Sequence, residues 1–209
     1  VPAEWYPLGR ILFAVTGLIA AGFVATGIYL DFPAITAELS VELVKRIAAA
    51  DPAFAADPVA TMALANSVLK IIPFVQPASW LLVIMANFWM ALAISRRSGL
   101  FRRPKDDWPT SLKMPSGALP LFALAMAGTF LGGGFGMIAW CIAGAFSMAF
   151  VFTGFTALHR LSRGKPWRMT ALWIAYATSL TIGIPVLAFL FAGLYDTAKK
   201  PAADGSNFN

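Results

Sequence analysis

Charged residues are scarce in this 209-residue chain, at 12% of the total, whereas hydrophobic residues make up 59%. Soluble domains usually carry about 25% charged residues, so the shortage argues against a soluble enzyme and excludes a disordered chain. The single cysteine, Cys141, excludes an intrachain disulfide and a metal site built on several cysteines. Because His159 is the single histidine, we also expect no multi-histidine metal site, and the sequence indicates no cofactor.

Charge is absent altogether from the 45 residues Met114–Leu158. One helix of that length is about 68 Å long, whereas the apolar core of a bilayer is about 30 Å thick. We therefore expect a transmembrane hairpin with a tight turn at the Gly-rich segment Gly132–Gly136. That segment lacks the preceding strand and the following Lys-Ser/Thr of a phosphate-binding loop.

Further uncharged stretches predict an all-α, polytopic transmembrane helical bundle of about five spans, forming a single membrane domain. We place the second span after Pro73 and Pro77 because proline interrupts helices. The last span is long enough to tilt or to kink at Pro185. The expected spans cover approximately residues 11–30, 79–95, 116–134, 137–158 and 170–194.

The segment 34–72, between the first two spans, has the pattern of amphipathic helices rather than of a membrane-spanning helix. Asp57-Pro58 predicts an N-cap followed by proline at the first helical position, and this helix is expected to end before Pro73. Two interpretations fit this segment. It forms one or two amphipathic helices in the outer interface, or it is a soluble helical loop that packs on the spans. Four apolar residues of the segment recur at helical spacing: Ile35, Leu39, Leu43 and Ile47.

Basic residues predict the orientation. With five spans, eleven of the 16 Lys and Arg residues fall on one side. That side is expected to be cytoplasmic in a multi-pass protein of the bacterial inner membrane. The Gly-rich turn and a flexible tail, 197–209, then lie outside, unless a re-entrant final segment reverses the side of the tail. The basic loops are expected to attract anionic lipids of the bilayer rather than nucleic acid, through Arg96, Arg97, Arg102, Arg103, Arg160 and Arg163.

The interiors of the expected spans contain no Asp, Glu, Lys, Arg or His, which argues against a proton pump or a proton-coupled carrier. No set of nucleophile and base is visible, so we do not expect an enzyme. Asn87 is either a ligand contact or the donor of an interhelical hydrogen bond. The candidate ligand-binding residues are Asn87, Trp80, Ser179 and Thr181, although hydroxyl groups of this kind also satisfy helix carbonyls structurally.

Small residues at four-residue spacing allow helix backbones to approach closely. They indicate either ordinary packing within the bundle or a docking surface for a partner membrane subunit. Both interpretations apply to Gly17, Ala21, Ala139, Ala143, Ala171, Ala175 and Gly183.

Several short motifs occur together along most of the chain: Glu4-Trp5-Tyr6-Pro7-Leu8-Gly9-Arg10, Ser79-Trp80, Asn87-Phe88-Trp89-Met90-Ala91, Lys113-Met114-Pro115, Gly154-Phe155-Thr156-Ala157-Leu158-His159 and Gly193-Leu194-Tyr195-Asp196. With them the chain resembles the YybS-like family of predicted bacterial membrane proteins, whose function is unknown. It departs from the family at Thr197–Lys200, and it lacks the family's first spans. Because it also begins at Val1 without a signal peptide, we expect the C-terminal part of a longer protein.

The family is distantly similar to substrate-binding subunits of energy-coupling-factor transporters. The resemblance therefore implies a small-molecule-binding transport subunit with a membrane-protein partner. The alternative is a non-catalytic structural or assembly subunit of a larger membrane complex.

Overall fold

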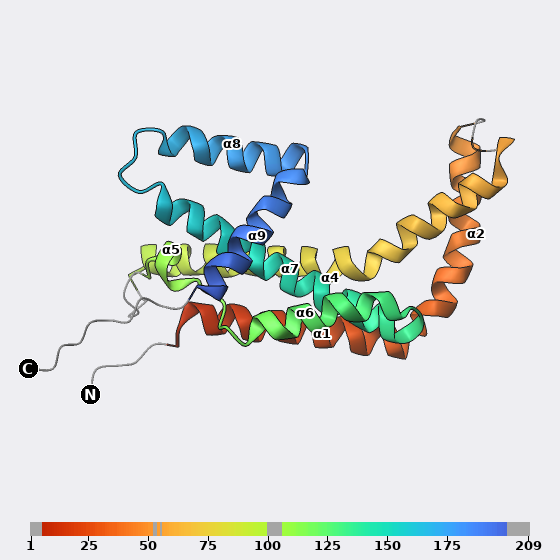
Figure 1. Ribbon diagram of the computed structural model, residues 1–209, viewed down its shortest axis with the longest axis horizontal. Helices are drawn as coiled ribbons and strands as arrows, with labels where there is room; N and C mark the ends of the chain where they lie inside the picture. The colour runs from red at the N-terminus through yellow and green to blue at the C-terminus, as the bar shows by residue number, and fades with distance from the viewer. Residues whose placement is uncertain (1–5, 52–53, 55, 100–105, 200–209) are drawn as a thin grey trace, which may run out of the picture.

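The computed structural model describes residues 6–51, 54, 56–99 and 106–199, and these are helical for the most part, with no strand among them. The all-α fold is therefore confirmed. In Figure 1, α1, α4, α6 and α7 run roughly along the long axis of the molecule, and α2 stands across one end. The helices are α1 (Leu8–Tyr29), α2 (Phe32–Ala50), α4 (Pro58–Arg97), α5 (Trp108–Ser111), α6 (Ala118–Gly128), α7 (Gly133–Leu161), α8 (Arg168–Thr181) and α9 (Ile184–Ala198).

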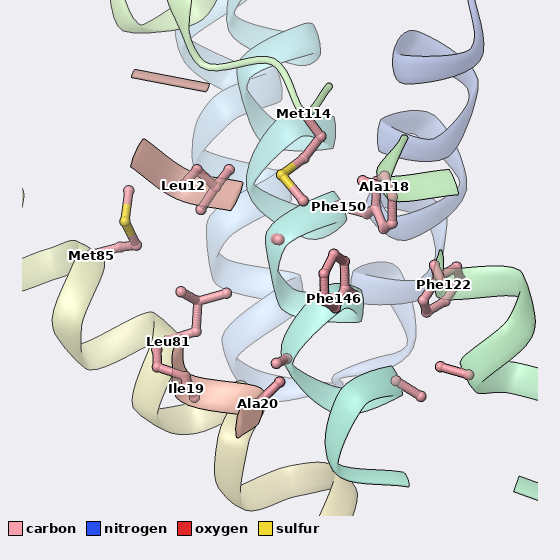
Figure 2. Packing of buried hydrophobic residues seen from close by; sticks show 14 of the residues in the cluster. Leu12, Ile19, Ala20, Leu81, Met85, Met114, Ala118, Phe122, Phe146 and Phe150 are labelled. Atoms are coloured by element: carbon pink, nitrogen blue, oxygen red, sulfur yellow. The ribbon is translucent and has the colours of Figure 1, made fainter. Parts of the chain in front are cut away.

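The central helix is α7, which packs against α1, α4, α6 and α9. Its Phe146 and Phe150 are almost completely buried. Figure 2 shows both rings between side chains of α1 and α4 on one side and Phe122 of α6 on the other. The rings of Phe122 and Phe150 meet edge to face with their centroids 5.3 Å apart. This continuous apolar core holds the helices in one bundle.

Among the residues that the structure describes, three helices are long and apolar enough to cross a membrane, namely α1, α4 and α7, and the bent pair α8–α9 counts as a fourth if it is one span. Five separate spans are therefore not confirmed. The expected span 116–134 is shorter than predicted, because α6 passes into a 3-10 turn, Thr129–Leu131, that ends at Gly132. Gly132 and Gly133 have φ angles of 69° and 57°, which only glycine adopts readily. The predicted tight turn at the Gly-rich segment is confirmed.

The predicted end of a helix before Pro73 is wrong, because α4 continues through Pro73 and Pro77 for 40 residues. Both prolines are buried against neighbouring helices, and such packing offsets the backbone hydrogen bonds that proline removes. Close packing is clearest at Gly144 of α7, where a Cβ would lie 2.0 Å from the carbonyl oxygen of Phe74. At about 1.5 Å per residue, α4 is about 60 Å long, twice the thickness of a bilayer core.

The first part of α4 and α2 form a helical hairpin at one end of the bundle (Figure 1). The predicted N-cap is confirmed, since Asp57 Oδ1 accepts a hydrogen bond of 3.0 Å from the backbone N–H of Ala60. On α4, the residues buried against α2 and the Gly-rich turn recur every four positions: Thr61, Ala65 and Leu69. Within the segment 34–72, α2 and the first part of α4 therefore pack on each other.

The expected span 170–194 is broken, since the chain bends by 119° between α8 and α9. Gly183 makes the turn with a φ of 75°, and Pro185 lies in the first turn of α9, where its missing N–H costs no hydrogen bond. Near the end of α9, Asp196 pairs with Arg160, which lies near the end of α7. Because α8 begins a few residues beyond that same end of α7, the α8–α9 hairpin starts and finishes at one end of the bundle.

We call this end the basic end, since it carries Lys113, Arg160, Arg163 and Arg168, and the opposite end, with α2 and Gly132–Gly136, the Gly-turn end. The helix α9 extends to Ala198. The first two residues of the expected tail 197–209 are therefore helical and lie at the basic end, while residues 200–209 lie outside the described residues.

Candidate functional site

A cavity of about 570 Å³ lies at the Gly-turn end, between α2, α4 and the segment that leads into α7. Small-molecule sites in proteins typically have about 300–1,000 Å³ and mainly apolar walls with a few polar groups. The walls are formed by Phe32, Thr36, Ala37, Asn66, Leu69, Lys70, Pro73, Thr129, Phe130, Gly132, Gly133, Gly136, Met137 and Trp140.

Three local features shape this cavity. The positive φ angles of Gly132 and Gly133 turn the chain sharply, so that the residues before the turn face the start of α7. On α4, Asn66, Lys70 and Pro73 are four and three residues apart, which places them on one face of the helix. Trp140 is fixed from α4, because its ring meets Phe74 edge to face with the centroids 5.7 Å apart.

The cavity carries a positive charge. Lys70 is the only ionisable side chain among the described residues that line it, and it makes no ion pair with any of the described residues. The amide of Asn66 supplies two further donors and one acceptor group. Thr129 Oγ1 already donates a hydrogen bond of 2.6 Å to the carbonyl of Met126. This combination favours a small anionic ligand over a cationic one.

A smaller compartment of about 310 Å³ adjoins the first, and the two share Phe32, Pro73 and Met137. Its walls also include Gln76, Trp80 and Cys141. Met137 packs tightly against α1, since a Cβ on Gly27 would lie 3.0 Å from Met137 Cε. Methionine has three rotatable side-chain bonds, so the boundary between the two compartments is a flexible side chain.

The structure brings one predicted ligand residue, Trp80, to this cavity. Asn87 is exposed and donates to the carbonyl of Val83 in its own helix at 2.9 Å, which neither of its two interpretations anticipated. Thr181 donates to Ala177 in the same way, at 2.8 Å. The hydroxyl oxygen of Ser179 is buried and has no hydrogen-bond partner among the described residues. None of these three residues lines the cavity.

Asn66, Lys70 and Gln76 were missed as site residues. The helix that carries Asn66 and Lys70 was expected to end before Pro73, and Gln76 lay between the two prolines, outside any expected element. Their spacing contains the signal. Once Pro73 and Pro77 are accepted inside a helix, Asn66 and Lys70 become polar residues on the face that also carries the buried Leu69 and Pro73.

Asp196 was also missed as a charge centre. It is 7% exposed, and its Oδ1 accepts a hydrogen bond from the guanidinium of Arg160. Lys113 Nζ lies 3.6 Å from the other carboxylate oxygen. Arg160 also donates to the carbonyl of Pro109, at 3.2 Å. The cluster joins α9, α7 and the segment before α6 at the basic end.

The arginines predicted to bind lipid headgroups differ in their surroundings. Arg160 is paired with Asp196, as described above, and Arg163 donates a hydrogen bond to Asp107. This hydrogen bond, with a further one from Thr110, lowers the pKa of the Asp107 carboxyl. Arg96 forms an ion pair with Asp106 at 3.4 Å. Arg97 is exposed, whereas Arg102 and Arg103 lie outside the described residues.

The predicted small-residue positions also differ in how far they are buried. Ala139 and Ala143 are buried in α7, Ala175 is buried in α8, and Ala171 is half-buried. Ala21 is exposed, and a Cβ on Gly17 or Gly183 would have no atom within 4 Å. The tightest helix contacts are instead at Gly144, Gly154 and Gly193.

No group of three or more metal-ligating side chains occurs in the part of the chain that the structure describes. Comparisons of the chain with models of protein families, with curated proteins and with solved structures found no match.

Proposed function

We propose that the chain is a multi-pass protein of the bacterial inner membrane that binds a small anionic molecule at its Gly-turn end, as the binding subunit of a transport system. The observation that carries the proposal is the cavity of about 570 Å³, in which Lys70 is the one ionisable residue among the described residues of the lining. Aromatic walls from Phe130 and Trp140 suit the carbon skeleton of an organic anion.

The basic end is cytoplasmic in this proposal. It carries the loops with most of the Lys and Arg residues, and such loops stay on the cytoplasmic side. Then α1, α4 and α7 cross the membrane, and the shorter α6 with its 3-10 turn carries the chain back from the basic end to the Gly-turn end. The α8–α9 hairpin re-enters the membrane, and the cavity opens outside. The excess length of α4 carries the hairpin of α2 and α4 beyond the bilayer, where a ligand arrives from water.

The two adjoining compartments favour transport of the ligand over ligand binding alone. The ligand enters beside Lys70 and reaches Gln76 and Trp80 of the smaller compartment when Met137 changes rotamer. Both residues lie further along α4, on the way from the outer end toward the middle of the bundle. A membrane partner that supplies energy completes the system, as the resemblance to transporter subunits implies.

The test is a thermal-unfolding screen of the full chain in mild detergent with small carboxylates and organic phosphates. We expect at least one anion to raise the unfolding temperature and to change the fluorescence of Trp140. Lys70→Gln is expected to remove that shift. Lys45→Gln is the matched control, since it removes one cation from α2 without touching the cavity. The proposal is wrong if no anion stabilises the chain, or if Lys70→Gln and Lys45→Gln respond alike.

A second candidate, a non-catalytic assembly subunit of a larger complex, is favoured by one observation. On α1, Gly17 and Ala21 present space that no other part of the described chain fills. Small residues of this kind allow a helix of another subunit to approach closely. Purification in a gentle detergent distinguishes the two, since an assembly subunit is recovered with a stoichiometric partner and shows no anion-dependent stabilisation.

A further inference from the structure

A second large cavity lies at the basic end, on the side of the bundle. It is a groove of about 550 Å³ between the C-terminal half of α4, α5, α7 and α8. Its floor comes from Phe152 and Phe155 of α7, and one end is closed by Trp108 of α5. Trp89 of α4 and Tyr176 of α8 stand at its edges and are 57% and 48% exposed. Neither compartment of the Gly-turn cavity shares a residue with it.

The groove opens sideways because α8 packs on α9 and not closely on α4. In Figure 1, α8 lies apart from α4, with α7 between them in the part near the basic end. The residues at its edges are aromatic. Tryptophan and tyrosine favour the level of lipid headgroups, because one part of each ring system is apolar and the other bears a polar N–H or O–H. The groove is therefore placed to meet the acyl chains of the bilayer.

The polar rim of the groove lies toward the basic end. His159 and Tyr176 face each other there, with Nε2 and the phenolic oxygen 2.9 Å apart. Arg163 and Arg168 carry positive charges close enough to act on the His159 ring. Arg163 is committed to Asp107, and Arg160, one residue beyond His159, is committed to Asp196. Of the three arginines near His159, one therefore lacks a carboxylate partner among the described residues.

That cation is Arg168. It forms no ion pair with any of the residues in the described ranges, and its Nε is buried without a hydrogen-bond partner among them. A buried donor of a charged group is costly to leave unsatisfied. Guanidinium groups match phosphate oxygens in geometry and charge. The missing partner is therefore best supplied by an anion with phosphate chemistry.

We propose that this groove binds one anionic phospholipid, with an acyl chain between Trp89 and the stacked rings of Phe155 and Tyr176, and with the phosphate at Arg168. Basic pockets between transmembrane helices on the cytoplasmic side are typical sites of anionic lipid headgroups. The net charge of +6 on the chain acts in the same direction. The proposal is independent of the ligand in the Gly-turn cavity, because it uses other residues at the other end of the bundle.

The experiment is native mass spectrometry of the full chain in mild detergent with added phosphatidylglycerol or phosphatidylcholine. We expect one phosphatidylglycerol molecule to remain bound where phosphatidylcholine is lost. Arg168→Gln is expected to weaken phosphatidylglycerol binding by about tenfold or more, as for a direct charge-assisted contact. Lys165→Gln, an exposed position outside the groove, is expected to weaken it by about fivefold or less, as for general surface attraction.

A second pair of variants tests the acyl chain separately from the headgroup. Ala86 lines the groove, so Ala86→Trp fills it and is expected to abolish retention of phosphatidylglycerol. Ala91, exposed on the same helix but outside the groove, is the control, and Ala91→Trp is expected to retain the lipid. The proposal is overturned if Arg168→Gln matches Lys165→Gln, or if Ala86→Trp retains the lipid as well as Ala91→Trp does.

Discussion

The guanidinium of Arg160 donates a hydrogen bond to the carboxylate of Asp196, which joins the end of α7 to the end of α9. The side chains of Asp196 and Arg160 are 9% and 27% exposed, so the pair is largely shielded from water. It closes the α8–α9 hairpin onto the bundle and fixes the side on which the described chain finishes.

Removing one partner of this pair is expected to be costly, because the other charge stays buried without compensation. We expect Asp196→Asn to lower the free energy of unfolding by about 3 kcal/mol. Glu42→Gln breaks the exposed ion pair with Arg46 on α2 and is expected to cost about 0.5 kcal/mol or less. Reversible unfolding in mixed micelles measures both changes. Equal effects of the two variants would contradict a structural role for Asp196.

The crossing of α7 and α9 depends on glycine. A Cβ on Gly193 would lie 1.8 Å from the carbonyl oxygen of Phe150, which is backbone and has no rotamer with which to move away. We expect Gly193→Ala to destabilise the chain by at least about 2 kcal/mol, as for an overpacked core. Gly17→Ala meets no atom within 4 Å and is expected to be neutral or to stabilise α1 by up to about 1 kcal/mol. A thermal-unfolding comparison in which Gly193→Ala is as stable as Gly17→Ala would show that the helices do not cross this closely.

The contact between Asp107 and Arg163 is expected to depend on pH only in acid. The pKa of Asp107 is lowered in the folded chain, first by the hydrogen bond from Arg163 and then by that from Thr110. The contact is therefore present above the ordinary pKa of a carboxyl and is lost as the pH falls through the lowered value. A carboxyl-carbon NMR titration reports this midpoint, and Arg163→Gln is expected to move it upward. An unchanged midpoint in that variant would mean that Arg163 does not hold Asp107 in solution.

Much of the helical content followed from composition and spacing. The turn at Gly132–Gly136 and the N-cap at Asp57 were predicted correctly, because a Gly-rich segment within an uncharged stretch and an Asp-Pro pair are local signals. The continuation of α4 through Pro73 was not predicted, since tertiary packing against α7 overrides a local rule about proline. The same continuation places Lys70 and the residues beyond Pro73 along one helix that borders both compartments, so the site was missed together with it.

The break between α8 and α9 had weaker signals. Gly183 was interpreted as a packing or docking residue because it continues the four-residue spacing of Ala171 and Ala175, whereas it makes the turn with a positive φ. Asp196 lies just beyond the predicted span, so its charge was excluded from the search for buried groups. Which arginines pair with carboxylates depends on contacts between residues as far apart as Asp107 and Arg163, which spacing along one helix does not reveal.

The central claim is that the chain has a cytoplasmic basic end, to which α9 returns, and an outer end that carries the cavity. Single cysteines placed at Lys165, Lys199 and Asp51 in a Cys141→Ala background test it with a membrane-impermeant maleimide, in intact cells and in inside-out vesicles. We predict that the cysteine at position 51 reacts in intact cells and that those at 165 and 199 react only in inside-out vesicles. Reaction of the cysteine at position 199 in intact cells, together with that at 51, would contradict the re-entrant hairpin and restore a fifth span.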